Sequence, residues 1–181
     1  MGKEHAYTIL ALCYLSKIHI EQGELYKAEE TLVEEIAAGR RSLGEDHLGV
    51  LVGCGELSRA YARQGRLDEA ERLSVETVSK VKASRGEDHP GFAHGMWKLG
   101  QLWEKKEEQA KAINAYQIAR TATERRLSSK HPLYEIISDR ITCLTENSDR
   151  NELKDDHLAD SPAEAGIHGL GITRLQPTQT W

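Results

Sequence analysis

The sequence predicts an all-α protein built from repeated pairs of helices. Residues 44–85 match residues 2–43 and 86–127 when the sequence is shifted by 42 positions, and a fourth, incomplete copy follows at 128–147. Within one copy, apolar and small residues recur at intervals of three and four, which is the spacing of a helix face and not of a strand. Copies of this kind bury their apolar faces against their neighbours, and about three are needed for a stable array.

Each full copy is expected to hold two helices separated by a turn. Gly23 and Gly65 stand between the helical stretches, where glycine adopts a left-handed conformation at little cost. Gly44 and Gly86 close the second helix of a pair in the same way. Glu107 takes the turn position in the third copy, where a left-handed glutamate costs roughly 1–2 kcal/mol. We therefore expect an altered turn, or a longer first helix, in that copy.

Helix starts and helix contacts follow the same period. Asp46 and Asp88 stand where the next helix needs a capping acceptor, and Pro90 suits the first helical turn. One column of large apolar residues is expected to face the partner helix, and one column of alanines to let two helices cross closely. The columns are Leu15, Leu57, Leu99 and Ile141, and Ala28, Ala70 and Ala112.

The fourth copy supplies one helix, at about 132–147, and then the pattern fades. A further short helix near 152–159 is compatible with the sequence. The end of the chain from Ser161 is rich in helix breakers, so residues 148–181 are predicted to form a partly disordered C-terminal extension. In the alternative, its apolar residues cover the exposed last helix. These residues are Ile167, Leu170, Ile172 and Leu175.

Composition limits the classes of partner and compartment. The 24 basic and 29 acidic residues give a net charge of −5, which weighs against nucleic acid as the main partner. Cys13, Cys54 and Cys143 are odd in number and lack CxxC spacing, which favours free thiols in a cytoplasmic protein. The apolar run 6–15 suggests a signal peptide as the alternative, but Glu4 removes the basic flank. The run is also shorter than the ~20 residues of a membrane span, so no membrane partner is expected.

The most regular chemical feature is a histidine every 42 residues. Metal binding is one interpretation of His5, His47, His89 and His131. Equivalent positions on packed helices lie at least ~8–10 Å apart, whereas zinc binds nitrogen at ~2.0–2.1 Å. The histidines therefore cannot converge on one ion, and we interpret them as structural residues of the junctions. We expect no metal and no cofactor.

Three motifs resemble those of tetratricopeptide repeats. They are LSRAY at 57–61 in the first helix, GRLDEAE at 65–71 at the turn, and GEDH or GEDHP at 44–47 and 86–90 at the junctions. The 42-residue period resembles the repeats of kinesin light chains and the C-terminal arrays of fungal NOD-like signal-transduction ATPases. The resemblance implies a right-handed α–α superhelix of about three and a half helix–turn–helix repeats over residues 2–147.

The resemblance also implies where a ligand would bind. In this family extended peptides lie on the concave surface lined by the first helices. Lysine and arginine there could pair with ligand carboxylates, and Trp97 could anchor an apolar group, which favours a partly acidic partner. The inward-facing residues are Tyr14, Lys17, Glu21, Glu56, Arg59, Arg63, His94, Trp97, Lys98, Gln101, Lys105 and Arg140.

Three functions stay open at this point. The first is a non-catalytic interaction module, as the sensor or scaffold part of a receptor-like signalling protein. The second is a cargo adaptor like kinesin light chain, although the asparagine that usually grips the peptide in that family is replaced here by Tyr14, Glu56, Lys98 and Arg140. The third is an enzyme, which would need a deep pocket with converging ionisable groups. No catalytic residues are predicted.

Overall fold

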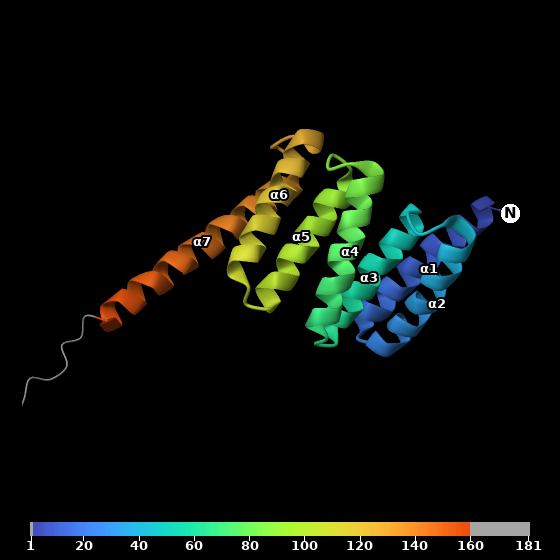
Figure 1. Cartoon of the computed structure of the whole chain (residues 1–181), viewed down its shortest axis with the longest axis horizontal. Helices are drawn as coiled ribbons and strands as arrows, with labels where there is room; N and C mark the ends of the chain where they lie inside the picture. Colours follow the sequence, from blue (N-terminus) through green and yellow to red (C-terminus); the bar gives the residue numbers. More distant parts are fainter. Residues whose placement is uncertain (1, 160–181) are drawn as a thin grey trace, which may run out of the picture. The chain divides into compact units, whose positions relative to one another are not determined.

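The computed structural model describes residues 2–159, with the side chains of residues 11–126 and 128–147. Within that range seven α-helices follow one another without a strand (Figure 1), which confirms the all-α repeat fold. The helices are α1 (Gly2–Gln22), α2 (Leu25–Leu43), α3 (Leu48–Arg63), α4 (Leu67–Arg85), α5 (Pro90–Lys105), α6 (Gln109–Leu127) and α7 (Pro132–Ala159).

Contacts divide the chain into a compact unit, Met1–Glu146, and a second unit, Asn147–Trp181. In the second unit the described backbone is the continuation of α7 to Ala159, so this helix is longer than the predicted 132–147. Asp149 occupies the register position of Gly23, Gly65 and Glu107, but here the helix continues through it. The expectations for residues 160–181, including cover of the last helix, lie outside the described residues.

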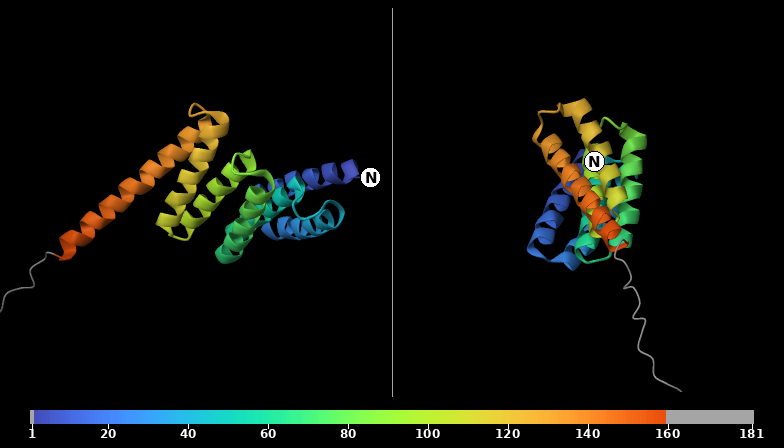
Figure 2. Two further views of the ribbon diagram at one scale, coloured as in Figure 1. Left: turned by 45° about the horizontal axis from the view of Figure 1, so that its top comes forward. Right: turned by 90° about the vertical axis from the view of Figure 1, so that its left-hand side faces the viewer.

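The helices of the first unit form consecutive antiparallel pairs. α1 packs on α2, α3 on α4 and α5 on α6, while α2 contacts α3 and α4 contacts α5, as two further views show (Figure 2). Ala28, Ala70 and Ala112 are each fully buried at the helix crossings. A larger side chain at any of them would force the paired helices apart.

In the column of large apolar residues, the first member, Leu15, is much more exposed than the others. Leu57 and Leu99 are buried, and Leu57 packs in one cluster with Leu32 and Ile36 of α2. This face of a first helix therefore contacts the preceding pair as well as its own partner. Leu15 is 43% exposed, so its predicted burial was wrong. The reason is that the described chain places no preceding pair on α1.

The turn in the third pair corrects another expectation. Glu107 adopts a left-handed φ of 61°, close to the 82° of Gly65, and α5 ends in register with α3. The backbone N–H of Glu108 donates to the Trp103 carbonyl at 2.9 Å, as the equivalent residues do in the preceding pair. The turn is therefore neither altered nor preceded by a longer helix. Packing of α5 on α6 imposes the turn despite the cost to glutamate.

The junction histidines cap the first helices. In each case the histidine Nδ1 accepts a hydrogen bond from the backbone N–H two residues later. The predicted caps, Asp46 and Asp88, were wrong by one position, because the residue with the extended backbone of a cap is the histidine. The bonds join His47 to Gly49 at 3.2 Å, His89 to Gly91 at 3.0 Å and His131 to Leu133 at 3.2 Å. The side chain of His5 lies outside the described residues.

Candidate functional site

A cavity of about 1210 Å³ opens between α3, α4, α5, α6 and α7. Its floor is apolar and includes Leu51, Val78, Val81 and Leu102, whereas its rim is charged. Tyr14, Lys17 and Glu21 on α1 do not line it. The other residues that the sequence placed on the concave surface do line it, namely Glu56, Arg59, Arg63, His94, Trp97, Lys98, Gln101, Lys105 and Arg140.

A missing side chain explains why the cavity lies at this junction. Cys13, Gly55 and Trp97 share one register position, 42 residues apart. Cys13 is buried between α1, α2 and α3, where its thiol donates to Glu35 Oε1 at 3.2 Å, and so closes the first junction. A Cβ added at Gly55 would meet no atom within 4 Å. The second junction is therefore hollow, and Trp97 lines it from α5.

A second glycine brings the apolar floor close to α5. A Cβ at Gly95 would lie 2.6 Å from Cγ2 of Val78, a distance that real side chains do not reach. Gly95 therefore permits α4 and α5 to cross closely. Gly53 plays the same part at the preceding junction, where a Cβ would lie 3.2 Å from Ile36 Cγ1. The close crossing places Val78 beneath the hollow that Gly55 leaves.

On the α3 wall the arginines are already paired. Arg59 Nη1 lies 2.6 Å from Glu21 Oε1, and its Nη2 lies 2.6 Å from Glu56 Oε2 in an ion pair that is not aligned as a hydrogen bond. Arg63 Nη1 lies 3.1 Å from Glu21 Oε2. Arg63 and then Arg59 hold the pKa of Glu21 below its usual range. Glu21 thus neutralises much of this wall from α1.

On the α5 wall Lys98 lacks such a counter-ion. Its Nζ lies 4.4 Å from the centroid of the Trp97 ring and donates to Gln101 Oε1 at 3.3 Å. No ion pair joins it to a carboxylate of the described residues, although the charges of Glu56 and Glu21 act on it from farther away. Burial, followed by the charge of Arg59, lowers the pKa of Lys98. Lys98 is a half-buried cation with a free capacity for an anion.

His94 completes the aromatic part of the α5 wall. Its ring centroid lies 5.6 Å from that of Trp97, with the planes tilted by 53°. Loss of hydration, followed by the charge of Lys98, lowers the pKa of His94, which favours the neutral ring at pH 7. Lys105 is exposed one turn beyond Gln101, on the same face of α5. The α5 wall therefore combines aromatic surface with positive charge.

The sequence did not predict the part that Tyr116 and Glu104 play. Glu104 accepts hydrogen bonds from the Tyr116 hydroxyl and from the guanidinium of Arg140 on α7. The tyrosine fits because residue 100 is glycine, where a Cβ would lie 2.5 Å from its ring. In the preceding pair the same two positions are Ser58 and Ser74, whose hydroxyls lie 2.5 Å apart. Comparing both positions across copies could have revealed this exchange of volume.

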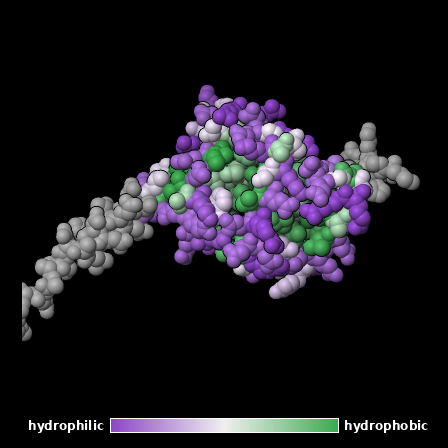
Figure 3. Space-filling view, in the orientation of Figure 1, coloured by the Kyte–Doolittle hydropathy of each residue, from purple (hydrophilic) through white to green (hydrophobic). Residues whose placement is uncertain are grey.

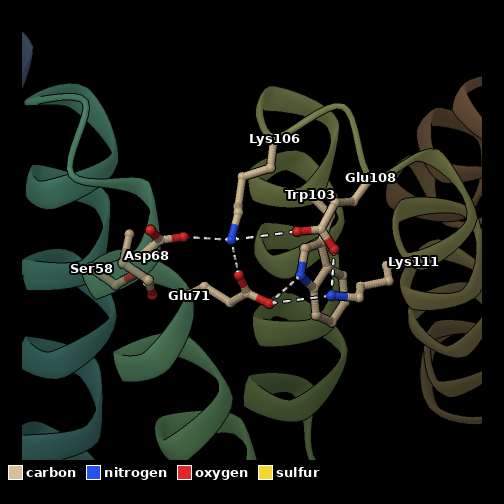
Figure 4. Close-up of polar contacts among 8 residues, drawn as sticks. Ser58, Asp68, Glu71, Trp103, Lys106, Glu108 and Lys111 are labelled. Atoms are coloured by element: carbon tan, nitrogen blue, oxygen red, sulfur yellow. Dashed lines mark hydrogen bonds and ion pairs between the residues drawn. The ribbon is translucent and has the colours of Figure 1, made fainter.

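A polar clamp joins consecutive pairs at their turns (Figure 4). Glu71 of α4 accepts a hydrogen bond from Trp103 Nε1 at 2.8 Å and pairs with Lys106. Lys106 Nζ also lies 2.8 Å from Asp68 Oδ1. One repeat earlier, Glu29 accepts from Gln64 and Arg66, each at 2.8 Å. The clamp holds each first helix, and hence the α5 wall, in register with the preceding pair.

The described part of the chain contains neither a candidate membrane span nor a cluster of metal ligands. None of its helices combines the length and the apolarity that crossing a bilayer requires. Among the same residues, no three or more histidine, cysteine or carboxylate side chains gather as metal ligands. On the face in Figure 3 the surface is mostly hydrophilic, and hydrophobic residues are exposed in small patches.

Comparison with known proteins agrees with this architecture. Residues 52–91 match the family model for the tetratricopeptide repeat. The array has the tetratricopeptide-repeat fold. The resemblance drawn from the motifs at 57–61 and 65–71 is thereby confirmed. No protein with a curated function matches the sequence significantly.

Solved structures extend the likeness to most of the chain. A candidate kinesin light chain of Podosopora anserina with nearly identical TPR-like repeats matches with a TM-score of 0.71 at 20% identity, over 78% of this chain and 67% of that chain. A variant of it matches with a TM-score of 0.70 over 77% and 66%. BtubC (BKLC) from P. vanneervenii matches with a TM-score of 0.62 at 14% identity, over 90% and 69%. At these identities the likeness establishes the fold alone.

Proposed function

We propose that this array is a non-catalytic interaction module that binds an extended, acidic segment of a partner protein in the cavity between α3 and α5. The proposal rests on the surroundings of Lys98. It is half-buried beside Trp97, lines a cavity, and has no carboxylate partner among the described residues. A carboxylate of the ligand would supply the missing counter-ion, and charge-assisted bonds of this kind are the strong ones.

The rest of the cavity supports a chain-like ligand. The tetratricopeptide-repeat fold serves typically as a scaffold for protein interactions. Lys105 and Gln101 continue the polar side of the α5 wall beyond Lys98, so a segment could run along this helix. Arg59 and Arg63 are paired with Glu21 and contribute less net charge. Tyr14 and Lys17 lie outside the cavity, so they would contact only a ligand that extends past it.

Two cellular roles are compatible with a module of this kind. We favour the sensor or scaffold part of a cytoplasmic, receptor-like signalling protein. The kinesin-light-chain description of the similar Podosopora anserina structures supports a cargo adaptor as the second candidate. Both roles use the same groove and neither needs chemistry of its own. Neither role implies binding of nucleic acid, a membrane or a cofactor.

A peptide-binding assay tests the proposal directly. The probe is a fluorescein-labelled twelve-residue peptide of alternating glutamate and leucine, followed by fluorescence anisotropy, with a lysine–leucine peptide for comparison. The full chain should prefer the acidic peptide. Lys98→Glu combined with Lys105→Glu should weaken that binding by about tenfold or more, the equivalent of one strong charge pair. Equal binding of both peptides would contradict the proposal.

The control must change charge without changing the cavity. Lys130→Glu does so, because Lys130 is exposed between α6 and α7 and does not line the cavity. It should leave binding of the acidic peptide unchanged. Charge reversal at Arg59 is a poor choice, because a glutamate there would lie beside Glu21 and Glu56 and bring three carboxylates together in total. Loss of binding in the Lys130 variant as well would show a diffuse charge effect instead of a groove.

A further inference from the structure

The cavity has two chemically distinct parts that a small amphipathic molecule would match. Its floor presents the aliphatic side chains of Leu51, Val78 and Val81. Its wall presents Lys98, a half-buried cation that forms no ion pair with a carboxylate of the described residues. Pockets for small molecules are mostly apolar with a few polar groups that fix orientation, and they enclose roughly 300–1,000 Å³. A cavity of about 1210 Å³ can hold such a ligand together with water.

We propose that the cavity binds a medium-chain aliphatic carboxylate, with its carboxylate on Lys98 and its alkyl chain over Val78 and Val81. This goes beyond the binding of a protein segment and does not depend on it. A single carboxylate is the right charge, because Arg59 and Arg63 are already paired with Glu21. An alkyl chain suits the aliphatic floor better than a second polar group would, because the hydroxyls of Ser58, Ser74 and Thr77 that also line the cavity already make hydrogen bonds within the fold.

Gly55 provides the room for the alkyl chain. The equivalent position is filled by Cys13 at the preceding junction, which is closed. At Gly55 a Cβ would meet nothing within 4 Å, so the space next to it is open. Filling this position with a larger side chain removes the space without a clash at the Cβ. That property makes Gly55 the sharpest point at which to test the proposal.

The primary experiment is isothermal titration calorimetry of the full chain with decanoate, below concentrations at which it aggregates. Decanoate should bind, and decanol should bind at least about tenfold more weakly, because it lacks the charge that pairs with Lys98. Across hexanoate, octanoate and decanoate, the Kd should fall by about fourfold per added methylene, as expected for burial in an apolar site. No binding of decanoate, or no dependence on chain length, would overturn the proposal.

Two variants and one matched control locate the site. Gly55→Leu should abolish binding of decanoate and decanol alike, with the helical circular dichroism unchanged. Lys98→Met should reduce decanoate binding to the level of decanol while leaving decanol binding intact. Lys130→Met should alter neither. Binding that survives Gly55→Leu would place the ligand elsewhere on the surface and overturn the proposal.

The outcome is separable from that of the peptide assay. Binding of the acidic peptide without binding of decanoate would overturn this inference and leave the proposed function intact. Binding of decanoate without the peptide would support this inference alone. If both bind, they share Lys98, so decanoate should displace the labelled peptide from the native chain. Simultaneous binding without competition would contradict the shared position of the carboxylate.

Discussion

Ser128 and Glu107 adopt backbone conformations that glycine adopts at the equivalent positions. Ser128 has φ 83° and ψ 156°, close to the φ 84° and ψ 168° of Gly86. This region of backbone space is essentially restricted to glycine, and other residues in it cost of order 1–3 kcal/mol. The chain therefore stores strain at the end of α6 that it avoids at the ends of α2 and α4.

Replacing Ser128 with glycine should stabilise the protein. We expect Ser128→Gly to raise the free energy of unfolding by about 1 kcal/mol, since the strain is relieved while the flexible unfolded glycine offsets part of the gain. Loss of the hydrogen bond from Lys130 N–H to Ser128 Oγ offsets a little more. Thermal unfolding followed by circular dichroism measures the change, with Gly86→Ser as the reverse control. A lower melting temperature for Ser128→Gly would contradict the strain.

Glu35 is a carboxyl group buried where few groups can solvate it. The residue is 3% exposed. Its Oε1 accepts a hydrogen bond from the Cys13 thiol at 3.2 Å, and its Oε2 has no hydrogen-bond partner among the described residues. Burial raises the pKa of Glu35 above its ordinary value. The Cys13 thiol, whose own pKa is raised by burial, stays protonated and donates. The folded chain thus favours the neutral form of Glu35.

This preference makes a prediction about pH. Below the ordinary carboxyl pKa, near 4.3, the group is neutral in both states and costs little. As the pH rises through the higher folded-state pKa, the folded protein must ionise a buried group and loses stability. Glu35→Gln should therefore gain in melting temperature relative to the native chain as the pH is raised from about 4 to 7. If the difference in melting temperature between the variant and the native chain stayed constant with pH, Glu35 would have to be well solvated.

Helix pairs and their crossings could be predicted from the sequence, whereas their ends could not be predicted fully. The 42-residue period and the column of Ala28, Ala70 and Ala112 could be predicted because buried positions must hold apolar or small residues, and these recur visibly in the sequence. The caps depend on which residue has an extended backbone, and Asp46 and His47 differ by one position. The turn at Glu107 was misjudged because packing of the flanking helices overrides the local preference of one residue.

The clamp at Glu71 links elements that local sequence patterns treat as separate. It joins α4 to the end of α5 through Trp103 and Lys106 and is mostly shielded from water. Glu71→Gln keeps the size of the side chain but removes the charge that both donors face. We expect a loss of about 1–2 kcal/mol, the usual range for a charged hydrogen bond with partial screening. The urea midpoint by circular dichroism measures it.

Glu76→Gln is the matched control for this change. Glu76 lies on the same helix and pairs with Lys80 of α4 at 2.9 Å, but it is exposed and joins no second element. Its loss should cost under about 0.5 kcal/mol, as for exposed pairs within a helix. Equal effects of the two variants would mean that the clamp contributes no more than an ordinary surface pair.

At the scale of the whole array, the concave lining was predicted and the cavity was not. Mapping by period placed Trp97 and Lys98 on one surface, and both line the cavity. The hollow itself results from the absence of a side chain at Gly55, where a Cβ would meet no atom within 4 Å. Patterns of apolar residues report what fills space, so they carry little information about space left empty. The assignment of these residues to a binding site stays a prediction.

The leucine column offers a further test at this scale. Leu15 and Leu57 are equivalent by sequence, but Leu57 is 7% exposed and Leu15 is 43% exposed. Leu57→Ala should cost about 2–5 kcal/mol, as for a buried leucine. Leu15→Ala should cost under about 1 kcal/mol, because little surface is withdrawn from water there. Similar melting temperatures for the two variants would contradict the exposed first face.

One register position distinguishes the first junction between helix pairs from the second. Cys13 seals the first junction and Gly55 leaves the second open, although the backbone repeats with the same period. Exchanging the two residues, by Cys13→Gly together with Gly55→Cys, would be expected to move the empty space one repeat toward the N-terminus. In an array of this kind, point substitutions at one position per repeat would thus be enough to shift a ligand-sized space, with the helix pairs around it unchanged.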